Sequence, residues 1–86
     1  MDKFYLVTFQ NTHEAIKAER EALKKNVRVI VVPTPTHITK SCGISLKTDE
    51  KNIKSIIKLI ELQNINVKKI YLVDGESINP MTIGLN

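Results

Sequence analysis

Cysteine, glycine and tryptophan are scarce or absent in this sequence, and each shortage excludes a class of site. The 86 residues include one cysteine, three glycines, two histidines and no tryptophan. One cysteine cannot form an internal disulfide, and together with two distant histidines it is poor material for a zinc site. The few glycines argue against a glycine-rich phosphate loop, and no glycine-flanked serine nucleophile is present. The sequence therefore predicts neither a metal nor a cofactor.

Long apolar runs are also missing. The longest, Val29–Pro33, has five residues, against the roughly 20 that a membrane-spanning helix needs. The first residues lead into a strand-like stretch and do not resemble a signal peptide. We therefore expect a cytoplasmic protein with no membrane partner. The formal net charge of +4 indicates mainly solvated lysines on helix faces, although a basic surface also attracts anionic partners.

The length of the chain limits how elaborate a site can be. A chain of this size buries only about 60–65% of its unfolded surface, which leaves no room for a deep active site. Function is then expected on a loop or on an exposed face. We expect one domain over residues 1–75, followed by a weakly structured C-terminal tail over residues 76–86.

Hydrophobic periodicity and capping residues predict the order βαββαβ. Expected strands cover residues 4–9, 27–32, 43–47 and 69–73. One helix is expected to begin at Asn11 or Thr12 and to end at Asn26, and a second to begin at Thr48 or Asp49 and to end at Asn64. The second helix has the strongest signal, because isoleucine recurs at positions 53, 56, 57 and 60.

This order is typical of a ferredoxin-like α+β sandwich, in which a four-stranded antiparallel sheet carries two helices on one face. The first and third strands then lie in the middle of the sheet. Residues 4–9 are apolar on both faces, with Tyr5, Val7 and Phe9 on one side, so the face turned away from the helices is also apolar. Such a face is typical of an interface, and we expect a homodimer through it.

Cys42 is the one candidate reactive group, and it follows a loop rich in proline and threonine. Gly43 comes next and permits a bulge that would turn the thiol outward. Lys40 and His37 are close in the sequence, and a nearby positive charge favours the reactive thiolate. These four residues form the candidate site.

An inert Cys42 is an equally open interpretation. Cys42, Ile44 and Leu46 alternate onto one face of the third strand, which would direct the thiol into the core. Free cysteine is often buried and then behaves as a small hydrophobic residue. His37 has a plain alternative as a solvated loop histidine, and His13 as a surface residue of the first helix.

The segment Pro33-Thr34-Pro35, followed by Ser41-Cys42-Gly43, resembles the bacterial selenium/sulfur carrier-like proteins. The opening strand and the start of the first helix match as well, so that the resemblance covers roughly residues 4–73. It implies that Cys42 carries sulfur or selenium as a persulfide or perselenide. It also implies a donor such as a cysteine desulfurase and an acceptor protein, and a carrier more than an enzyme with its own turnover.

The chemistry of a carrier fits a small domain. One accessible thiolate attacks the donor persulfide and later releases the terminal atom to an acceptor. No metal, base or deep pocket is required, and no second cysteine is present to convert the persulfide into a disulfide. This interpretation predicts that the side chain of Cys42 is at least partly exposed.

Two other classes of function stay open. The chain is an alternative candidate for an interaction or regulatory module in which Cys42 is merely packed. Its basic pI of about 9.3 would also suit an RNA-binding sheet, but residues 43–47 contain no aromatic side chain for base stacking. We therefore expect no nucleic-acid partner.

Overall fold

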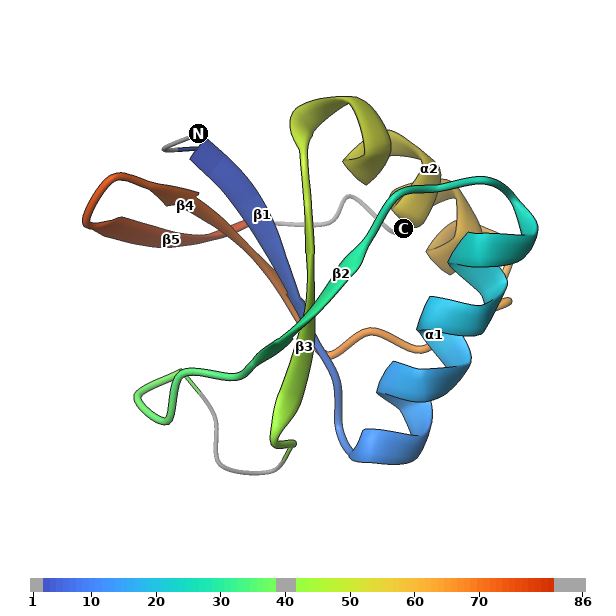
Figure 1. Cartoon of the computed structure of the whole chain (residues 1–86), viewed down its shortest axis with the longest axis horizontal. Coiled ribbons are helices and arrows are strands. Elements are labelled where there is room, and N and C mark those ends of the chain that lie inside the picture. The colour runs from blue at the N-terminus through green and yellow to red at the C-terminus, as the bar shows by residue number, and fades with distance from the viewer. Residues whose placement is uncertain (1–2, 39–41, 82–86) are drawn as a thin grey trace.

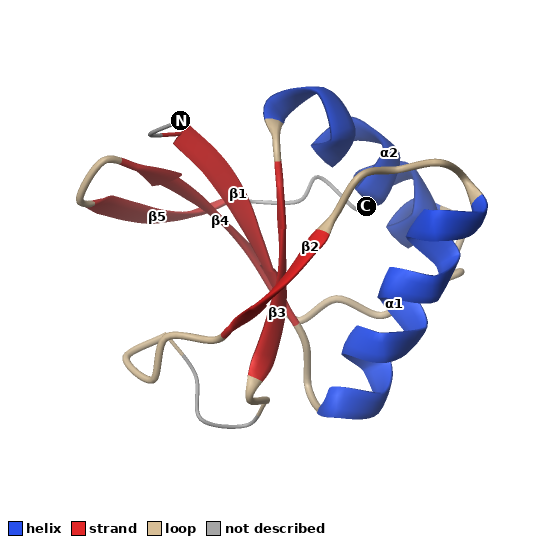
Figure 2. Cartoon of the chain, viewed as in Figure 1, coloured by secondary structure: helices blue, strands red, loops and turns tan. Residues whose placement is uncertain are grey.

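The computed structural model describes residues 3–38 and 42–81, which form an α+β fold. Its elements in chain order are β1 (Lys3–Thr8), α1 (Thr12–Lys24), β2 (Ile30–Pro33), β3 (Ile44–Thr48), α2 (Glu50–Glu61), β4 (Lys69–Asp74) and β5 (Ser77–Met81). The strands form one antiparallel sheet in the order β2-β3-β1-β4-β5. Both helices lie on the same side of this sheet (Figures 1 and 2).

The sheet has five strands, so the predicted count of four is wrong. The additional strand, β5, pairs with β4 across a turn at Gly75, whose φ is 62°. The expectation of weak structure after residue 75 is therefore wrong for Ser77–Met81, and residues 82–86 lie outside the described residues. The first and third strands are interior strands, as the sequence predicts.

The cap of α1 follows the sequence closely. Asn11 is the N-cap, and its side-chain oxygen accepts a hydrogen bond from the backbone N–H of Glu14 at 2.9 Å. Asn26 adopts the left-handed conformation with φ of 58°, and Val27 donates its N–H to the carbonyl of Ala22 at 2.9 Å. This is the hydrogen-bond pattern of a helix that ends at a left-handed residue, as predicted for Asn26.

The second helix differs from the prediction only at its end. Asp49 is the N-cap, and it accepts a hydrogen bond from the backbone N–H of Asn52 at 2.8 Å. The left-handed residue after the helix is Gln63, with φ of 62°, and not Asn64. Asn64 takes the next position and donates its N–H to the carbonyl of Leu59 at 3.0 Å. The predicted stop is therefore one residue late.

The second strand begins later than predicted. The backbone N–H of Arg28 donates to the side chain of Asn52 at 3.2 Å, and its carbonyl accepts from the hydroxyl of Thr48 at 2.7 Å. The backbone of Arg28 is thus hydrogen-bonded to side chains and not to the backbone of a neighbouring strand. β2 therefore starts only at Ile30.

The core lies between the sheet and the helices. The face of α1 that is buried carries only Ala15, Ala18 and Ala22, and small side chains allow a helix to lie close to a sheet. The buried face of α2 is instead made of Ile53, Ile56, Leu59 and Ile60. From the sheet, Tyr5, Val7 and Phe9 enter this core. None of the helices in the described ranges is long and apolar enough to cross a membrane.

The opposite face of the sheet is apolar too, as the sequence predicts. A shallow hollow of about 260 Å³ on it is lined by Phe4, Leu6, Val32, Pro33, Pro35, Lys47, Val73 and Ile78. The ammonium group of Lys47 lies 4.3 Å from the centre of the Phe4 ring, an attractive cation–π contact. A homodimer through this face stays a prediction.

Candidate functional site

Cys42 lies two residues before the first residue of β3 and points into the core. Its side chain is 3% exposed and belongs to the same buried cluster as Leu46. The thiol donates a hydrogen bond to the carbonyl oxygen of Ile44 at 3.1 Å. The alternation of Cys42, Ile44 and Leu46 thus correctly predicts the direction of the thiol. The expectation that the thiol is partly exposed is wrong.

Gly43 does not turn the thiol outward. The pairing of β2 with β3 continues without an extra residue to Thr34, whose N–H donates to the carbonyl of Gly43 at 3.0 Å. A bulge would interrupt this register. The φ angle of Gly43 is not in the positive range, so nothing in its own backbone requires glycine. An added Cβ at this position would also meet open space.

The Pro-Thr-Pro segment is fastened to β3 through Thr34. Besides its bond to Gly43, Thr34 shares a buried hydrogen bond with Ser45, and the two hydroxyl oxygens lie 2.5 Å apart. A turn follows in which the N–H of Ile38 donates to the carbonyl of Pro35 at 3.0 Å. Thr34 therefore bonds to the residue before Ile44 and to the residue after it, and these two bonds attach the Pro-Thr-Pro segment to the start of β3.

The structure brings only part of the predicted site together. Cys42 and Gly43 are consecutive, and His37 lies exposed in the turn over residues 36–38. Among the described residues, no hydrogen bond joins His37 to Cys42. Lys40 lies outside the described residues, so its predicted place beside the thiol stays a prediction. The same holds for the chemical roles of all four residues.

Sequence reasoning missed Ser45 as the residue that holds the loop. Ser45 is fully buried in a strand whose neighbouring positions are apolar, and a buried hydroxyl needs a hydrogen-bond partner. A serine inside a short strand, together with a threonine fixed between two prolines, was the available signal. The partner could not be identified from the sequence, because it depends on the register of β2 against β3.

The environment of the thiol favours an unreactive state in this conformation. The hydrogen bond to the carbonyl oxygen of Ile44 uses the thiol as a donor, whereas nucleophilic attack on sulfur requires the thiolate. With 3% of the side chain exposed, a macromolecular donor has no route to the sulfur atom. In the part of the chain that the structure describes, no group of histidine, cysteine and carboxylate side chains could hold a metal ion.

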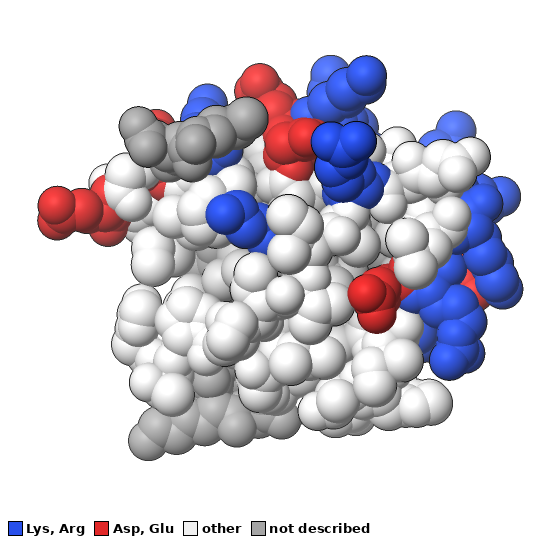
Figure 3. Space-filling view, viewed as in Figure 1, with Lys and Arg blue, Asp and Glu red and all other residues white. Residues whose placement is uncertain are grey.

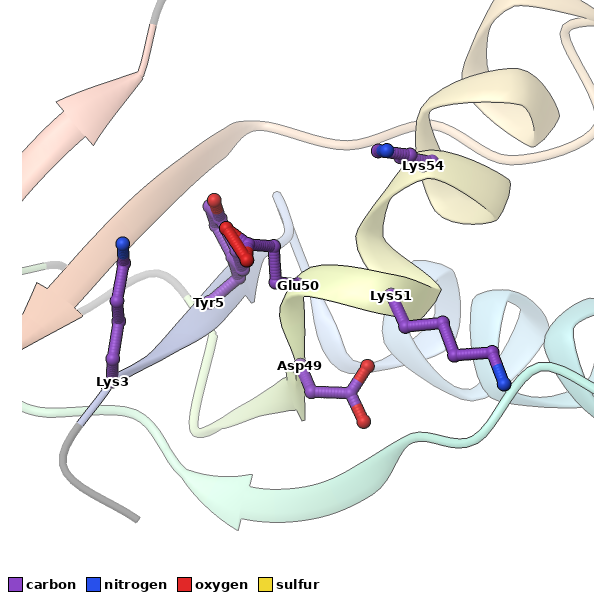
Figure 4. A pocket seen from close by; sticks show the side chains of 6 residues that line it. All are labelled: Lys3, Tyr5, Asp49, Glu50, Lys51 and Lys54. Carbon is purple, nitrogen blue, oxygen red and sulfur yellow. The ribbon is translucent and has the colours of Figure 1, made fainter.

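A larger hollow, of about 560 Å³, lies at the other end of β3, where α2 begins. It is lined by Lys3, Tyr5, Asp49, Glu50, Lys51 and Lys54 (Figure 4). Cys42 precedes β3 and Asp49 follows it, so the strand separates this hollow from the thiol. The carboxylate of Asp49 is already engaged as the helix cap. The hollow is therefore not part of the candidate site around Cys42.

The basic side chains are spread over the helices. Lys and Arg gather over the helical side of the molecule in Figure 3, and the exposed ones on α1 and α2 are Lys17, Arg20, Lys24, Lys51, Lys54 and Lys58. The expectation of solvated lysines on helix faces is confirmed. Residues 34–38, which follow β2, lie on the other side of the view, away from the helices (Figure 1).

Comparison with known proteins gives one match. No curated protein and no solved structure matches the chain. A family model described as "Putative Se/S carrier protein-like" matches residues 4–72. The matched range runs from β1 into β4 and includes Thr34, Cys42 and Gly43. Because the match covers most of the 86 residues, the chain belongs to the Se/S carrier protein-like family.

Proposed function

We propose that this protein carries sulfur or selenium on Cys42, as a persulfide or perselenide, between a donor and an acceptor protein in the cytoplasm. The observation that carries the proposal is the position of the thiol. Cys42 is the one cysteine of a chain that belongs to the Se/S carrier-like family, and it directly follows the loop that Thr34 fastens to β3. The donor would be a protein persulfide such as that of a cysteine desulfurase.

The transfer step is a thiol–persulfide exchange. The thiolate of Cys42 attacks the terminal sulfur of the donor persulfide, the S–S bond of the donor breaks, and the donor leaves as a thiolate. A proton taken up by the new terminal sulfur completes the Cys42 persulfide. The reverse exchange with an acceptor thiolate then unloads it. No external oxidant is needed, since the sulfur atom arrives already oxidised.

The burial of the thiol makes local opening part of this proposal. Among the described residues, three hydrogen bonds hold the region: Thr34 to Gly43, Thr34 to Ser45, and Cys42 to Ile44. Because β2 is an edge strand, β3 is its only neighbour in the sheet. The end of this strand pair is therefore the kind of segment that opens at lower free energy than the core. Local opening would expose the thiol transiently, and a partner that binds the open form would increase the population of that form.

The test is sulfur loading of the native protein. The full chain is incubated with a cysteine desulfurase and cysteine, and its mass is measured without reductant. We expect a mass increase of one sulfur atom in the wild type and none in Cys42→Ser. The matched control is the wild type unfolded in urea with a chemical persulfide donor, which reports that the thiol itself is competent. A native protein that stays unmodified while the unfolded protein reacts would refute the carrier function.

A second function has one specific observation in its favour. Cys42 is 3% exposed and belongs to the buried core cluster, as expected for an interaction or regulatory module with a packed cysteine. In that case Cys42→Val, which retains the packing, would leave every cellular role of the protein intact. The carrier function predicts the opposite, because Cys42→Val abolishes sulfur loading while the fold persists.

The fold supports a ferredoxin-like assignment with an extension. The order β2-β3-β1-β4, with a helix after β1 and another after β3, is the arrangement expected for the βαββαβ sandwich. We infer that β5 is an appended hairpin strand on that framework. The match to the family ends at residue 72, before β5 begins.

A further inference from the structure

The outer edge of β2 is the least protected strand edge of the described structure. It carries Ile30 and Val31, which are 56% and 40% exposed. Natural edge strands usually carry charged side chains, prolines or bulges that discourage pairing with another strand, and of these β2 has only Pro33, at its end. Residues 29–33 contain no charged side chain, and the pairing of β2 with β3 contains no bulge.

We propose that two copies of this chain associate through β2. The two strands run antiparallel about a twofold axis at Val31, so that the two sheets become one continuous sheet. This interface is distinct from the hollow on the open sheet face, and it does not depend on sulfur transfer.

The backbone of β2 presents the hydrogen-bonding groups for this pairing. In an antiparallel ladder, residues alternate between facing one neighbouring strand and facing the other side. The bond from Thr34 to Gly43 fixes this alternation. By the same register, Val32 and Ile30 bond toward β3, whereas Val31 and Val29 direct their N–H and C=O groups outward.

A twofold axis at Val31 uses these outward groups reciprocally. The N–H of Val31 in each copy meets the carbonyl of Val31 in the other copy. The N–H of Val29 meets the carbonyl of Pro33, which lies opposite it. Pro33 has no N–H to donate, but it already occupies an outward position in the register with Ile44, so its ring does not disturb the ladder with β3.

The side chains of the edge are also complementary to themselves. In this pairing Val31 lies beside Val31 of the second copy, and Ile30 lies beside Val32. These central cross-strand pairs are all β-branched and apolar, which is the favourable composition for neighbours in a sheet, and the outer pair of Val29 with Pro33 is apolar as well. No like charges face one another. A strand of unrelated sequence would need apolar side chains at the same positions to form these pairs, whereas a second copy of β2 has them.

The other sheet edge does not offer an equivalent surface. β5 has the sequence Ser77-Ile78-Asn79-Pro80-Met81, in which the polar residues Ser77 and Asn79 interrupt the apolar side chains. Pairing of β2 with β5 of another copy would also leave free edges and extend without limit. Pairing of β2 with itself closes after two copies.

The association is tested by sedimentation velocity of the full chain from about 1 µM to about 1 mM, the range of weak protein affinities. We expect a dimer to form with rising concentration. We also expect the amide hydrogen of Val31 to exchange more slowly at high concentration, which would report the edge directly. A monomer at every concentration overturns the proposal.

Matched variants locate the interface. Val31→Pro removes the outward N–H and leaves the ladder with β3 intact, and Val31→Lys places like charges together if the proline variant does not fold. Each should raise the dissociation constant at least tenfold. Ile78→Thr on the open sheet face and Leu23→Asn on α1 should leave it unchanged. If Ile78→Thr breaks the dimer and the Val31 variants do not, the contact is through the sheet face and the edge proposal is wrong.

Discussion

The hydroxyl groups of Thr34 and Ser45 lie 2.5 Å apart in a buried contact between the Pro-Thr-Pro segment and β3. The backbone of Thr34 is bonded as well, to the carbonyl of Gly43. Cys42 directly precedes Gly43 in the chain. A hydrogen bond from Thr34 to Gly43 therefore joins the Pro-Thr-Pro and Ser-Cys-Gly parts of the motif. A change at Thr34 acts on the backbone next to the thiol.

Thr34→Val tests the energetic importance of this contact. Valine has nearly the shape of threonine, but it leaves the hydroxyl of Ser45 buried without its partner. An unsatisfied buried hydroxyl costs about 1–3 kcal/mol. We expect the free energy of unfolding, measured by urea titration, to fall by about that amount.

The matched control for this substitution is the double variant Thr34→Val with Ser45→Ala. Replacing both partners by apolar groups removes the unsatisfied hydroxyl, so the double variant should be more stable than Thr34→Val alone. The coupling between the two sites is obtained from the double-mutant cycle. If the costs of the single substitutions simply add, the hydroxyl groups do not interact and the contact is unimportant.

Alkylation of Cys42 reports whether the thiol is reached by local opening. Thr34→Val should accelerate the reaction with iodoacetamide in native buffer, because it weakens the attachment of residue 34 to the backbone next to the thiol. Ile56→Val, in the core on α2, provides the comparison: it should destabilise the whole fold by about 0.5–1.5 kcal/mol. Under local opening, Ile56→Val leaves the alkylation rate unchanged. An equal acceleration in both variants would mean that only global unfolding exposes the thiol.

The part of the fold that the sequence predicts well rests on local signals. The caps at Asn11 and Asp49 and the left-handed stop at Asn26 involve residues within a few positions of one another. β5 was missed because Asn79 and Pro80 are unfavourable strand residues. An edge strand tolerates them, since only one side of it is bonded. That β5 has an edge position available beside β4 follows from the tertiary structure and not from its own residues.

The candidate site was predictable only in part, for a related reason. Strand alternation correctly directs Cys42 to the side of Leu46, whereas the sequence alone also permits a bulge at Gly43. The bond between Thr34 and Gly43 decides against the bulge. That bond joins two strands whose register depends on all their pairs, so the residues around Cys42 alone do not determine it.

Gln63 offers a way to stabilise the protein without touching the site. Its φ is 62°. This backbone conformation is energetically unfavourable for a residue with a Cβ atom, whereas glycine adopts it without a steric penalty. We expect Gln63→Gly to raise the free energy of unfolding by up to about 1 kcal/mol, after subtraction of the greater chain entropy of glycine. Asn64→Gly, at the neighbouring position without a positive φ, is the control and should not stabilise. A Gln63→Gly protein less stable than the wild type would contradict the role of Gln63 in ending α2.

The N-cap of α2 predicts a specific dependence of stability on pH. The backbone N–H of Asn52 and, secondarily, its side-chain amide donate to the carboxylate of Asp49, each at 2.8 Å. These hydrogen bonds lower the pKa of Asp49 from its ordinary value of 3.8. A carboxyl group whose pKa is lower in the folded state stabilises the fold above its unfolded pKa, and this stabilisation is lost as the pH falls through the folded pKa.

The wild type should therefore lose stability below about pH 4 that the non-titrating variant Asp49→Asn does not lose. Asparagine is the matched control because it still caps a helix, and urea unfolding between about pH 5 and pH 2 measures the difference. Identical pH profiles for the two proteins would show that the carboxylate of Asp49 is no more stable in the folded chain than in the unfolded one.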